Sequence, residues 1–491
     1  MALITEGNYP LTFGGVSTWC DQLVRHLPEI EFDLVTITGR RGGELLWELP
    51  LNVRGVTELA FWEPGAPGEQ PRYLRAMGWS RGHSGASRCV HRLLELLLAD
   101  EPDVDAFDPV LDTLITEARE QRLSSAMRDR WAVDLLIDLW HRRGMTSSMQ
   151  EVIVALDVLE HLLRTVSFPV PKADVYHAVS NGLAGLVAVG AAGRAGATVV
   201  LSEHGVYLRE RYLEYMTGDL GQAARDLILR FHRLLSIAVY QRADVILPVS
   251  RYNRRWEVQN GVDPDRIRVI HNGVDPSRFP PAAPGGTQRP PTVGFIARID
   301  RIKDPLTLLR AADMIRHDVP GLRVRLWGET AKDQDDYEAE CRELVERLGL
   351  ADVVSFEGRT ADPVEAYRSV DVIAMSSISE GLPYGVLEAM MCGTAVVSTD
   401  VGGISEALEG VGVLVPPRDP ASLAAACSAL LLDPVRRADL GRAARRRAVE
   451  EFSLERMISS YRAVYDQVGP MIDLGVMAQR RGDDRHVAPT G

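Results

Sequence analysis

The sequence predicts an α/β protein of two domains, each a doubly wound parallel sheet, that face each other across a cleft. Residues 1–275 and 292–452 both alternate short apolar segments of strand length with segments of helical spacing. A proline- and glycine-rich segment, residues 276–291, lies between them and reads as a linker. The chain has 491 residues, too many for one ordinary hydrophobic core, so two domains are expected.

The first domain opens with a strand, a glycine-containing loop, a helix and a second strand, an order typical of doubly wound sheets. About residues 71–165 then change character, because their apolar residues recur at helical spacing and no strand pattern interrupts them. We therefore predict a helical insertion in the first domain. Its predicted strands are residues 3–5, 32–38, 175–178, 198–202, 245–249 and 267–270, with a helix at 17–27.

The second domain repeats the alternation of strands and helices after the linker. Its predicted strands are residues 292–297, 323–327, 353–356, 370–377, 394–399 and 412–415. A last helix is predicted over residues 454–467. The polar tail, residues 471–491, is predicted to be disordered.

Composition excludes several classes of protein. The hydrophobic content of 46% and charged content of 25% are those of a globular domain, and the net charge of −13 argues against nucleic acid as the main partner. The N-terminus lacks the basic and apolar regions of a secretory signal. The most apolar stretch, residues 182–201, is interrupted by glycines and Arg194, which argues against a membrane span.

Five cysteines without metal-site spacing predict reduced thiols and a cytoplasmic location. Lysine is rare beside arginine, a bias that suggests a bacterial source.

Residues 376–408 carry the most informative pattern in the chain. A buried strand leads into a loop with Glu380 and Gly381, and a helix begins near Pro383 and carries Glu388. Loops at the carboxyl ends of parallel strands form the ligand crevice, where helix N-termini attract phosphate and carboxylates accept bonds from sugar hydroxyls. The pattern predicts a nucleotide-sugar site. The alternative is an amphipathic helix whose Glu388 is simply solvated.

Two basic residues follow the first strand of the second domain. Arg298 and Lys303 precede Asp304, an expected N-cap, and Pro305, an expected first helical residue. Cations beside a helix N-terminus suit a diphosphate, whose charge grows as the sugar–phosphate bond breaks. We therefore predict a diphosphate clamp, although cations at a protein surface are common.

Three positions in the first domain are candidates for the same site. Gly14 and Gly15 lie between the first strand and the first helix, where a bare backbone permits close approach to an anion, or merely a tight loop. His177 ends a strand, where a histidine either binds substrate or donates a structural hydrogen bond. His204 follows the next strand and either lines the acceptor side or is structural, while Asn272 is assigned to the hinge and cleft wall.

The segment that contains Glu380 and Glu388, with seven residues between them, resembles the signature of glycosyltransferase family 4, the retaining enzymes of the GT-B fold. The resemblance includes the intervening residues Gly381, Leu382, Pro383, Tyr384 and Gly385. It implies that Glu380 faces the transferred sugar and that Glu388 holds the nucleotide ribose. It also implies two Rossmann-like domains, with residues 453–470 crossing back to the first domain.

The same resemblance assigns roles to the other candidates. Arg298 and Lys303 match the family's cations, Gly15 approaches the donor phosphate across the cleft, and His177 matches a histidine near the donor sugar. The first domain further resembles the PelF-type exopolysaccharide glycosyltransferases, at residues 6–19, 176–185 and 202–211. This implies a cytosolic enzyme that uses UDP-glucose, with a carbohydrate or lipid-linked acceptor and a possible membrane polysaccharide-synthesis complex as partner. The enzyme would lie in the cytoplasm or peripherally at the inner face of the membrane.

No cofactor and no metal are expected beside the nucleotide-sugar co-substrate. Residues 333–336 contain three aspartates, yet they open a polar helical segment away from the strand ends, so a solvated helix start is favoured over a metal site. Two other functions stay open. A nucleotide-sugar epimerase of the same build would need its own acid–base pair. The presence of Arg298, Lys303, Glu380 and Glu388 speaks against a non-catalytic sugar-nucleotide-binding subunit.

Overall fold

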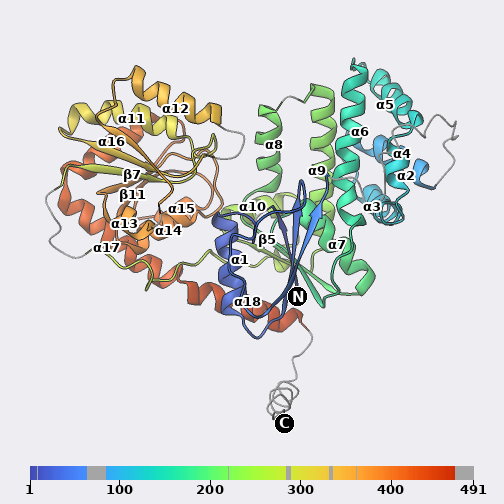
Figure 1. The fold of residues 1–491 in the computed structure, drawn as a ribbon, viewed down its shortest axis with the longest axis horizontal. Helices are drawn as coiled ribbons and strands as arrows, with labels where there is room; N and C mark the ends of the chain where they lie inside the picture. The colour runs from blue at the N-terminus through green and yellow to red at the C-terminus, as the bar shows by residue number, and fades with distance from the viewer. Residues whose placement is uncertain are drawn as a thin grey trace, which may run out of the picture.

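Two parallel six-stranded sheets, each covered by helices, form the two lobes of the molecule (Figure 1). The computed structural model describes residues 1–7, 9–62, 85–218, 220–282, 289–330, 335–360 and 362–469. The strand orders are β3-β2-β1-β4-β5-β6 and β12-β11-β10-β7-β8-β9. Each order reverses beside its first strand, the topology that places a ligand crevice at the strand carboxyl ends. The predicted fold class is confirmed.

The first sheet agrees with the sequence at most of its strands. Its strands are β1 (Ala2–Glu6), β2 (Phe32–Thr38), β3 (Val53–Ala60), β4 (Val175–Ala178), β5 (Thr198–Glu203) and β6 (Val245–Pro248). The helices between them are α1 (Gly15–His26), α7 (Leu183–Ala195), α8 (Tyr207–Thr217), α9 (Gln222–Arg242) and α10 (Arg251–Gln259), with a short 3-10 helix at Pro264–Arg266. β3 was not predicted, because it is an edge strand whose residues are mostly half-buried or exposed.

The predicted strand at residues 267–270 is wrong. Ile267 forms only an isolated bridge with Ile246, and the segment donates two backbone hydrogen bonds, to the carbonyl oxygens of Ile246 and Pro248. β6 ends at Pro248, which has no N–H with which to return a bond. A regular ladder therefore cannot continue along this edge.

Helices form the region between the third and fourth strands. They are α2 (Gly85–Leu97), α3 (Val104–Arg119), α4 (Leu123–Met127), α5 (Arg130–Arg142) and α6 (Met149–Arg164), with a 3-10 turn at Thr165–Ser167. Asp103, Asp129 and Ser148 cap three of these helices by accepting bonds from backbone N–H groups. Phe107 and Trp140 are completely buried in a cluster shared with α7 and α9. The helices therefore extend the core of the first domain, on the side away from the second (Figure 1). Residues 71–84 of the predicted insertion lie outside the described ranges.

The second sheet contains all six strands that the sequence predicts, with bounds shifted by no more than a few residues. They are β7 (Thr292–Ile296), β8 (Arg323–Trp327), β9 (Val354–Gly358), β10 (Val372–Met375), β11 (Ala395–Thr399) and β12 (Val413–Val415). The helices are α11 (Pro305–Asp318), α12 (Asp335–Arg347), α13 (Pro363–Arg368), α14 (Tyr384–Met391), α15 (Ile404–Leu408), α16 (Pro420–Leu432) and α17 (Pro434–Glu451). Four of them begin with the pair Asp-Pro, the aspartate capping the helix and proline opening it.

The last helix, α18 (Leu454–Val468), returns to the first domain (Figure 1). Tyr461 and Tyr465 are buried there, and Arg462 pairs with Glu29 at 2.8 Å. The domain limits drawn from the sequence stay predictions, and the predicted disordered tail lies outside the described residues. Within the described ranges, no helix combines the length and apolarity needed to cross a lipid bilayer.

Candidate functional site

The loops that follow β7 and β10 are joined at the carboxyl edge of the second sheet. The hydroxyl of Ser376 donates to the backbone oxygens of Lys303 and Asp304, at 3.1 and 2.7 Å. The amide of Ile378 donates to the oxygen of Ile302 at 2.7 Å. These bonds hold the loop that carries Glu380 against the loop that carries Lys303, as neighbouring parallel strands require.

Lys303 and Glu380 form an ion pair at this junction. Lys303 Nζ lies 2.6 Å from Glu380 Oε1, which also accepts a bond of 2.6 Å from Ser377 Oγ. The two side chains are 19% and 8% exposed, so the pair is screened little by solvent. The predicted diphosphate cation and sugar carboxylate are therefore direct neighbours.

Arg298 belongs to the same loop but is held differently. Its Nη2 lies 3.2 Å from Asp300 Oδ2, and its side chain is 63% exposed. Asp300 is buried, and its other oxygen accepts bonds from the amides of Ile302 and Lys303 at 2.9 and 3.0 Å. Asp300 thus shapes the loop that presents both cations. The sequence analysis passed over it, although an aspartate between two cations just after a strand was a usable signal.

Glu388 lines a pocket of about 210 Å³ on the same edge of the sheet. Its Oε2 accepts a bond of 2.7 Å from the hydroxyl of Tyr367. Burial raises the pKa of Glu388 and the Tyr367 hydroxyl opposes that rise. The other lining residues are Ile296, Ala297, Trp327, Gly328, Arg359, Thr360, Tyr367 and Gly385. This geometry is incompatible with the alternative of a freely solvated Glu388.

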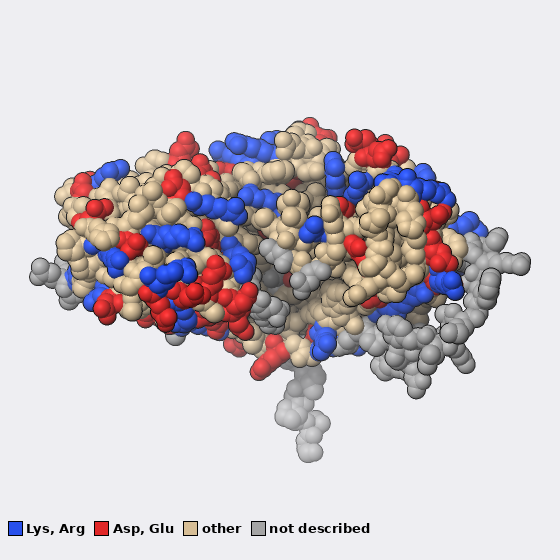
Figure 2. All heavy atoms as spheres, turned by 90° about the horizontal axis from the view of Figure 1, so that it is seen from above, with Lys and Arg blue, Asp and Glu red and all other residues tan. Residues whose placement is uncertain are grey.

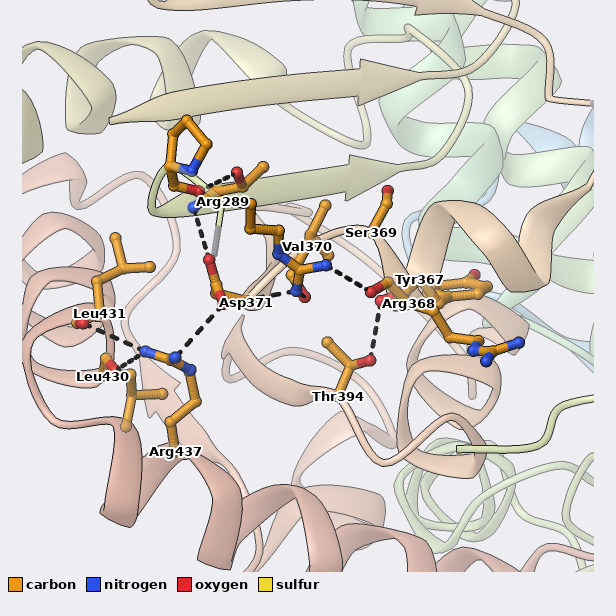
Figure 3. A network of polar contacts seen from close by, with 12 residues as sticks. Arg289, Tyr367, Arg368, Ser369, Val370, Asp371, Thr394, Leu430, Leu431 and Arg437 are labelled. Atoms are coloured by element: carbon orange, nitrogen blue, oxygen red, sulfur yellow. Dashed lines mark hydrogen bonds and ion pairs between the residues drawn. The ribbon is translucent and has the colours of Figure 1, made fainter. Parts of the chain in front are cut away.

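A polar network holds Tyr367 in place (Figure 3). The hydroxyl of Thr394 donates to the backbone oxygen of Tyr367 at 2.9 Å. Asp371, four residues after Tyr367, forms ion pairs with Arg289 and Arg437, at 3.5 and 3.4 Å. It also accepts a hydrogen bond from the amide of Thr292, the first residue of β7. Nothing in the local sequence around Tyr367 pointed to its contact with Glu388, because that contact depends on how α13 packs on α14.

The glycine loop of the first domain faces the start of α14. A Cβ added at Gly15 would lie 3.4 Å from the Tyr384 ring, and the Tyr384 hydroxyl donates to Gln22 at 2.9 Å. The guanidinium of Arg359 lies 3.9 Å from the centroid of the Phe13 ring. The exposed Gly15 thus lies beside the first residue of α14, and its approach to a donor phosphate stays a prediction. Pro383 itself occupies the N-cap position, one residue before the helix.

Close packing between the domains continues at Gly381 and Leu382. A Cβ at Gly381 would overlap the backbone oxygen of His204, which only a glycine avoids. The side chain of Asn272 donates to the backbone oxygen of Leu382 at 2.7 Å, which agrees with the cleft-wall role expected for Asn272. The loop that bears Glu380 is therefore seated directly on the first domain. The surface is hollowed between the two domains, and charges of both signs are interspersed around it (Figure 2).

The geometry argues against the predicted site role of His177. The side chain is completely buried, and its ring nitrogens lie 2.7 Å from the Tyr465 hydroxyl and 2.8 Å from Ser202 Oγ. Burial lowers the pKa of His177 to about 3, so the ring is neutral. Nδ1 thus joins the ring to α18 and Nε2 joins it to β5, so both nitrogens are occupied by structural contacts. His204 packs edge-on against Trp19 at 4.7 Å, and burial lowers its pKa to about 3 as well.

Two acidic clusters lie outside this edge of the sheet. Asp335 and Asp336 open α12, and Asp336 pairs with Arg301 at 3.1 Å, which agrees with a helix start; Asp333 lies outside the described ranges. Asp157, Glu160 and His161 gather on α6. Glu160 there is paired with Arg128 and Arg164 at 3.0 and 2.6 Å, so its charge is already neutralised.

Family models match both halves of the chain. Residues 1–265, more than half of it, match a family described as Domain of unknown function (DUF3492). Residues 290–433 match the family described as Glycosyl transferases group 1. The second match spans β7 to α16 and so includes Lys303, Glu380 and Glu388.

Among curated relatives, the D-inositol 3-phosphate glycosyltransferase of Salinispora arenicola (strain CNS-205) is 36% identical over 226 residues, which is 42% of this chain and 50% of the relative. The protein of the same name from Kineococcus radiotolerans is 36% identical over 240 residues, 43% of this chain and 54% of the relative. The chain thus spans about half the length of the curated relatives it matches.

Solved structures resemble nearly the whole chain. Anabaena Alr3699/HepE, in complex with UDP, matches with a TM-score of 0.60 and 16% identity, over 95% of this chain and 100% of that one. Sucrose-phosphate synthase (tll1590) from Thermosynechococcus elongatus matches with a TM-score of 0.62 and 19% identity, over 95% and 98%. These likenesses establish the GT-B fold. The chain belongs to the DUF3492 family, and it joins that domain to a glycosyl transferases group 1 domain in a GT-B fold.

Proposed function

We propose that the protein is a retaining glycosyltransferase that moves a sugar from a nucleotide diphosphate to a carbohydrate or lipid-linked acceptor. The observation that carries this proposal is the ion pair of Lys303 and Glu380 beside the pocket of Glu388. A cation, a sugar-facing carboxylate and a ribose-facing carboxylate would then lie at one sheet edge. In a nucleotide sugar the diphosphate links the sugar to the ribose, and each of these three parts would have a partner of suitable charge.

The donor in this proposal is UDP-glucose. Support comes from the resemblance of the first domain to PelF-type enzymes, and from the likeness of the fold to HepE, which was solved with UDP, with UDP and glucose, and with UDP-glucose. On the same basis we place the reaction in exopolysaccharide synthesis on the cytoplasmic side of the membrane. The proposal includes attachment of the protein to the membrane through a polysaccharide-synthesis complex.

Each residue has a defined task in this reaction. Glu388, oriented by Tyr367, accepts bonds from the ribose hydroxyls, and Glu380 accepts bonds from the sugar. Lys303 and Arg298 stabilise the charge that develops on the departing diphosphate, while the backbone at Gly15 approaches the same phosphate. The bond between the sugar carbon and the phosphate oxygen breaks as the acceptor oxygen bonds to that carbon from the same face. The acceptor proton passes to the departing phosphate oxygen.

Thermal unfolding with UDP, GDP and ADP, followed by assays of nucleotide release from UDP-glucose, tests the proposal. A ligand that binds only the folded state at about 100 times its dissociation constant stabilises the protein by roughly 2.7 kcal/mol. We expect UDP to raise the unfolding temperature and GDP and ADP to have smaller effects. UDP release should require an acceptor. Protection by GDP or ADP alone would contradict the donor assignment, and turnover of UDP-glucose to an isomer without acceptor would indicate an epimerase.

A further inference from the structure

The first turn of α10 is a fixed point of the first domain. Ser250 caps the helix, and its hydroxyl accepts a bond of 3.1 Å from the amide of Asn253. The Asn253 side chain donates to the backbone oxygen of Glu203, the last residue of β5, at 3.2 Å. All three side chains are buried. The turn is therefore tied to the carboxyl edge of the first sheet.

A carboxylate of the second domain binds this turn. Glu406 lies in α15, and its Oε2 and Oε1 accept bonds of 2.8 and 2.7 Å from the amides of Arg251 and Tyr252. These two amides open α10, and the first amides of a helix have no partner within the helix. His271 Nε2 lies 3.3 Å from the same Oε2. Glu406 thus binds two segments of the first domain at once.

The surroundings of Glu406 hold its carboxylate as an anion. The side chain is 17% exposed, so solvent screens its contacts only in part. Burial raises the pKa of Glu406, but the hydrogen bonds from His271 and from the amides of Arg251 and Tyr252 outweigh burial and lower the pKa. A helix N-terminus also favours an anion. The domains are therefore joined here by charge-assisted hydrogen bonds.

The turn that precedes α15 is locked to the loop that carries Glu380. The amide of Gly403 donates to the backbone oxygen of Gly381 at 2.6 Å. A Cβ at Gly402, whose φ is +61°, would overlap the backbone oxygen of Glu380, so only glycine fits there. Glu406 lies in the first turn of α15. Its position therefore fixes that of the preceding turn and, through the turn, that of the donor loop.

Arg209 forms a second bridge between the first turn of α10 and the same loop. From α8 it donates through Nη1 to the Tyr252 hydroxyl at 2.8 Å and through Nη2 to the backbone oxygen of Ile378 at 3.1 Å. Tyr252 is thus bound by Glu406 at its amide and by Arg209 at its hydroxyl. Two independent sets of bonds therefore hold the Glu380 loop at one place on the first domain.

We propose that Glu406 is a positioning residue of the transfer reaction. By binding the first turn of α10, it holds the Glu380 loop, and with it the donor sugar, where an acceptor on the first domain can reach the sugar. The inference rests on the proposed function, because it takes Glu380 as the carboxylate that faces the donor sugar. Lys303 and Glu388, assigned to the diphosphate and the ribose, both belong to the second domain. Loss of the Glu406 contact should therefore spare UDP binding and reduce transfer.

The competing explanation is that Glu406 only stabilises the folded protein. In that case its replacement would lower the free energy of unfolding and leave the kcat of the folded molecules unchanged. Comparison of kcat with UDP affinity separates the two explanations, because only a positioning role lowers kcat in molecules that are folded and have the donor bound.

Glu406→Gln is the first test, with nucleotide release from UDP-glucose measured in the presence of maltose as the acceptor probe. A carboxamide has one acceptor oxygen, and its NH2 group would face the second amide, so the variant cannot bind both N–H groups. We expect kcat to fall by about tenfold or more, while UDP affinity measured by calorimetry changes by less than about threefold. Glu409→Gln, the same change at the exposed end of α15, should behave as the parent.

Hydrogen exchange read by mass spectrometry tests the contact without any acceptor. In the parent the amides of Arg251 and Tyr252 should exchange slowly although they open a helix, and so should the amide of Gly403. In Glu406→Gln all three should exchange faster, by about tenfold or more, while the rest of α10 stays protected. Arg251→Pro removes one of the amides but suits the first position of a helix. It should accelerate exchange at Gly403 more than Arg251→Ala, which keeps the amide.

Parental kcat in a folded Glu406→Gln would overturn the inference. So would a loss of UDP affinity as large as the loss of kcat, since the residue would then act on donor binding. Fast exchange of the Arg251 and Tyr252 amides in the parent would overturn it as well, and this measurement decides the matter even if the variants do not fold. Absence of UDP binding and of nucleotide release in the parent would instead contradict the proposed function, while the exchange of the two amides would still test the contact.

Discussion

Lys303 Nζ lies 2.6 Å from Glu380 Oε1, and this contact joins two loops that are 77 residues apart in the chain. The cation assigned to the diphosphate and the carboxylate assigned to the sugar are therefore coupled. A diphosphate that enters the site competes with Glu380 for the charge of Lys303. In the proposed reaction, the growing charge on the departing phosphate would take a larger share of the charge of Lys303, so this contact would strengthen toward the transition state.

Replacing Lys303 by alanine should damage turnover far more than folding. Loss of one preorganised contact to a developing charge costs about 2.7–4 kcal/mol of barrier, or roughly 10²–10³-fold in rate. Nucleotide release from UDP-glucose measures turnover, and thermal unfolding measures stability. Lys172→Ala removes an exposed lysine elsewhere and should leave turnover unchanged. Parental turnover in a folded Lys303→Ala would rule out the clamp.

Gly381→Ala should weaken the seating of the second domain on the first. The added Cβ would overlap the backbone oxygen of His204, so the Glu380 loop must shift. Overpacking of this kind costs typically about 1–3 kcal/mol, and we expect turnover to fall by at least roughly tenfold through misplacement of Glu380. Gly193→Ala has no neighbour within 4 Å of its added Cβ and should be neutral or slightly stabilising. Equal turnover in both variants would contradict the close packing at Gly381.

A buried carboxyl pair predicts that stability declines as the pH rises. Glu203 and Glu257 are 2% and 0% exposed, and Tyr240 donates to Glu203 at 2.7 Å. Burial raises the pKa of Glu203 from 4.5 to about 7, and burial together with Glu203 raises that of Glu257. The folded protein therefore holds protons that the unfolded chain releases. The stabilisation from Glu203 is complete below about pH 4.5 and is lost as the pH rises through about 7.

Denaturant unfolding of Glu203→Gln between pH 5 and 8 tests this linkage. A neutral amide cannot lose a proton, so the variant should lose less stability across that range than the parent, by more than about 1 kcal/mol. Glu346→Gln controls for loss of an exposed carboxylate. Parallel stability profiles for the parent and Glu203→Gln would show that Glu203 does not titrate in this window.

Chelation of divalent metals should leave turnover largely intact. Arg298 and Lys303 supply positive charge beside the predicted diphosphate, so the proposed reaction requires no added cation. Nucleotide release after treatment with EDTA is the measurement. Abolition of turnover and its recovery with Mn²⁺ would instead favour a metal role for the aspartates at the start of α12.

Much of this fold could be predicted from the sequence because the central strands of both sheets are buried on both faces. Strands such as β10 and β11 lie where near-continuous apolar runs predicted them, which is typical of parallel sheets. Asp304 and Pro305 similarly marked the start of α11. The edge strand β3 escaped notice because Arg54, Gly55 and Glu58 break its apolar pattern.

Contacts between distant segments could not be read in this way. His177 ends a strand at the expected edge, but its ring is held by Tyr465, 288 residues away, so its local position gave no sign of a structural role. The contact of Tyr367 with Glu388 likewise depends on helix packing. The position of Lys303, Glu380 and Glu388 at one edge of the second sheet was predictable, because each comes soon after a strand in the local sequence. Their mutual geometry was not.

The two glutamates of the donor loop test the central claim most directly. Calorimetry should show that Glu388→Ala weakens binding of UDP and of UDP-glucose by at least about tenfold, because charge-assisted bonds to the ribose are lost. Glu380→Ala should bind UDP as tightly as the parent, or more tightly since Lys303 is freed, and should reduce nucleotide release by at least about tenfold. If both variants bind UDP with parental affinity and release it at the parental rate, the donor site does not lie at this edge of the second sheet.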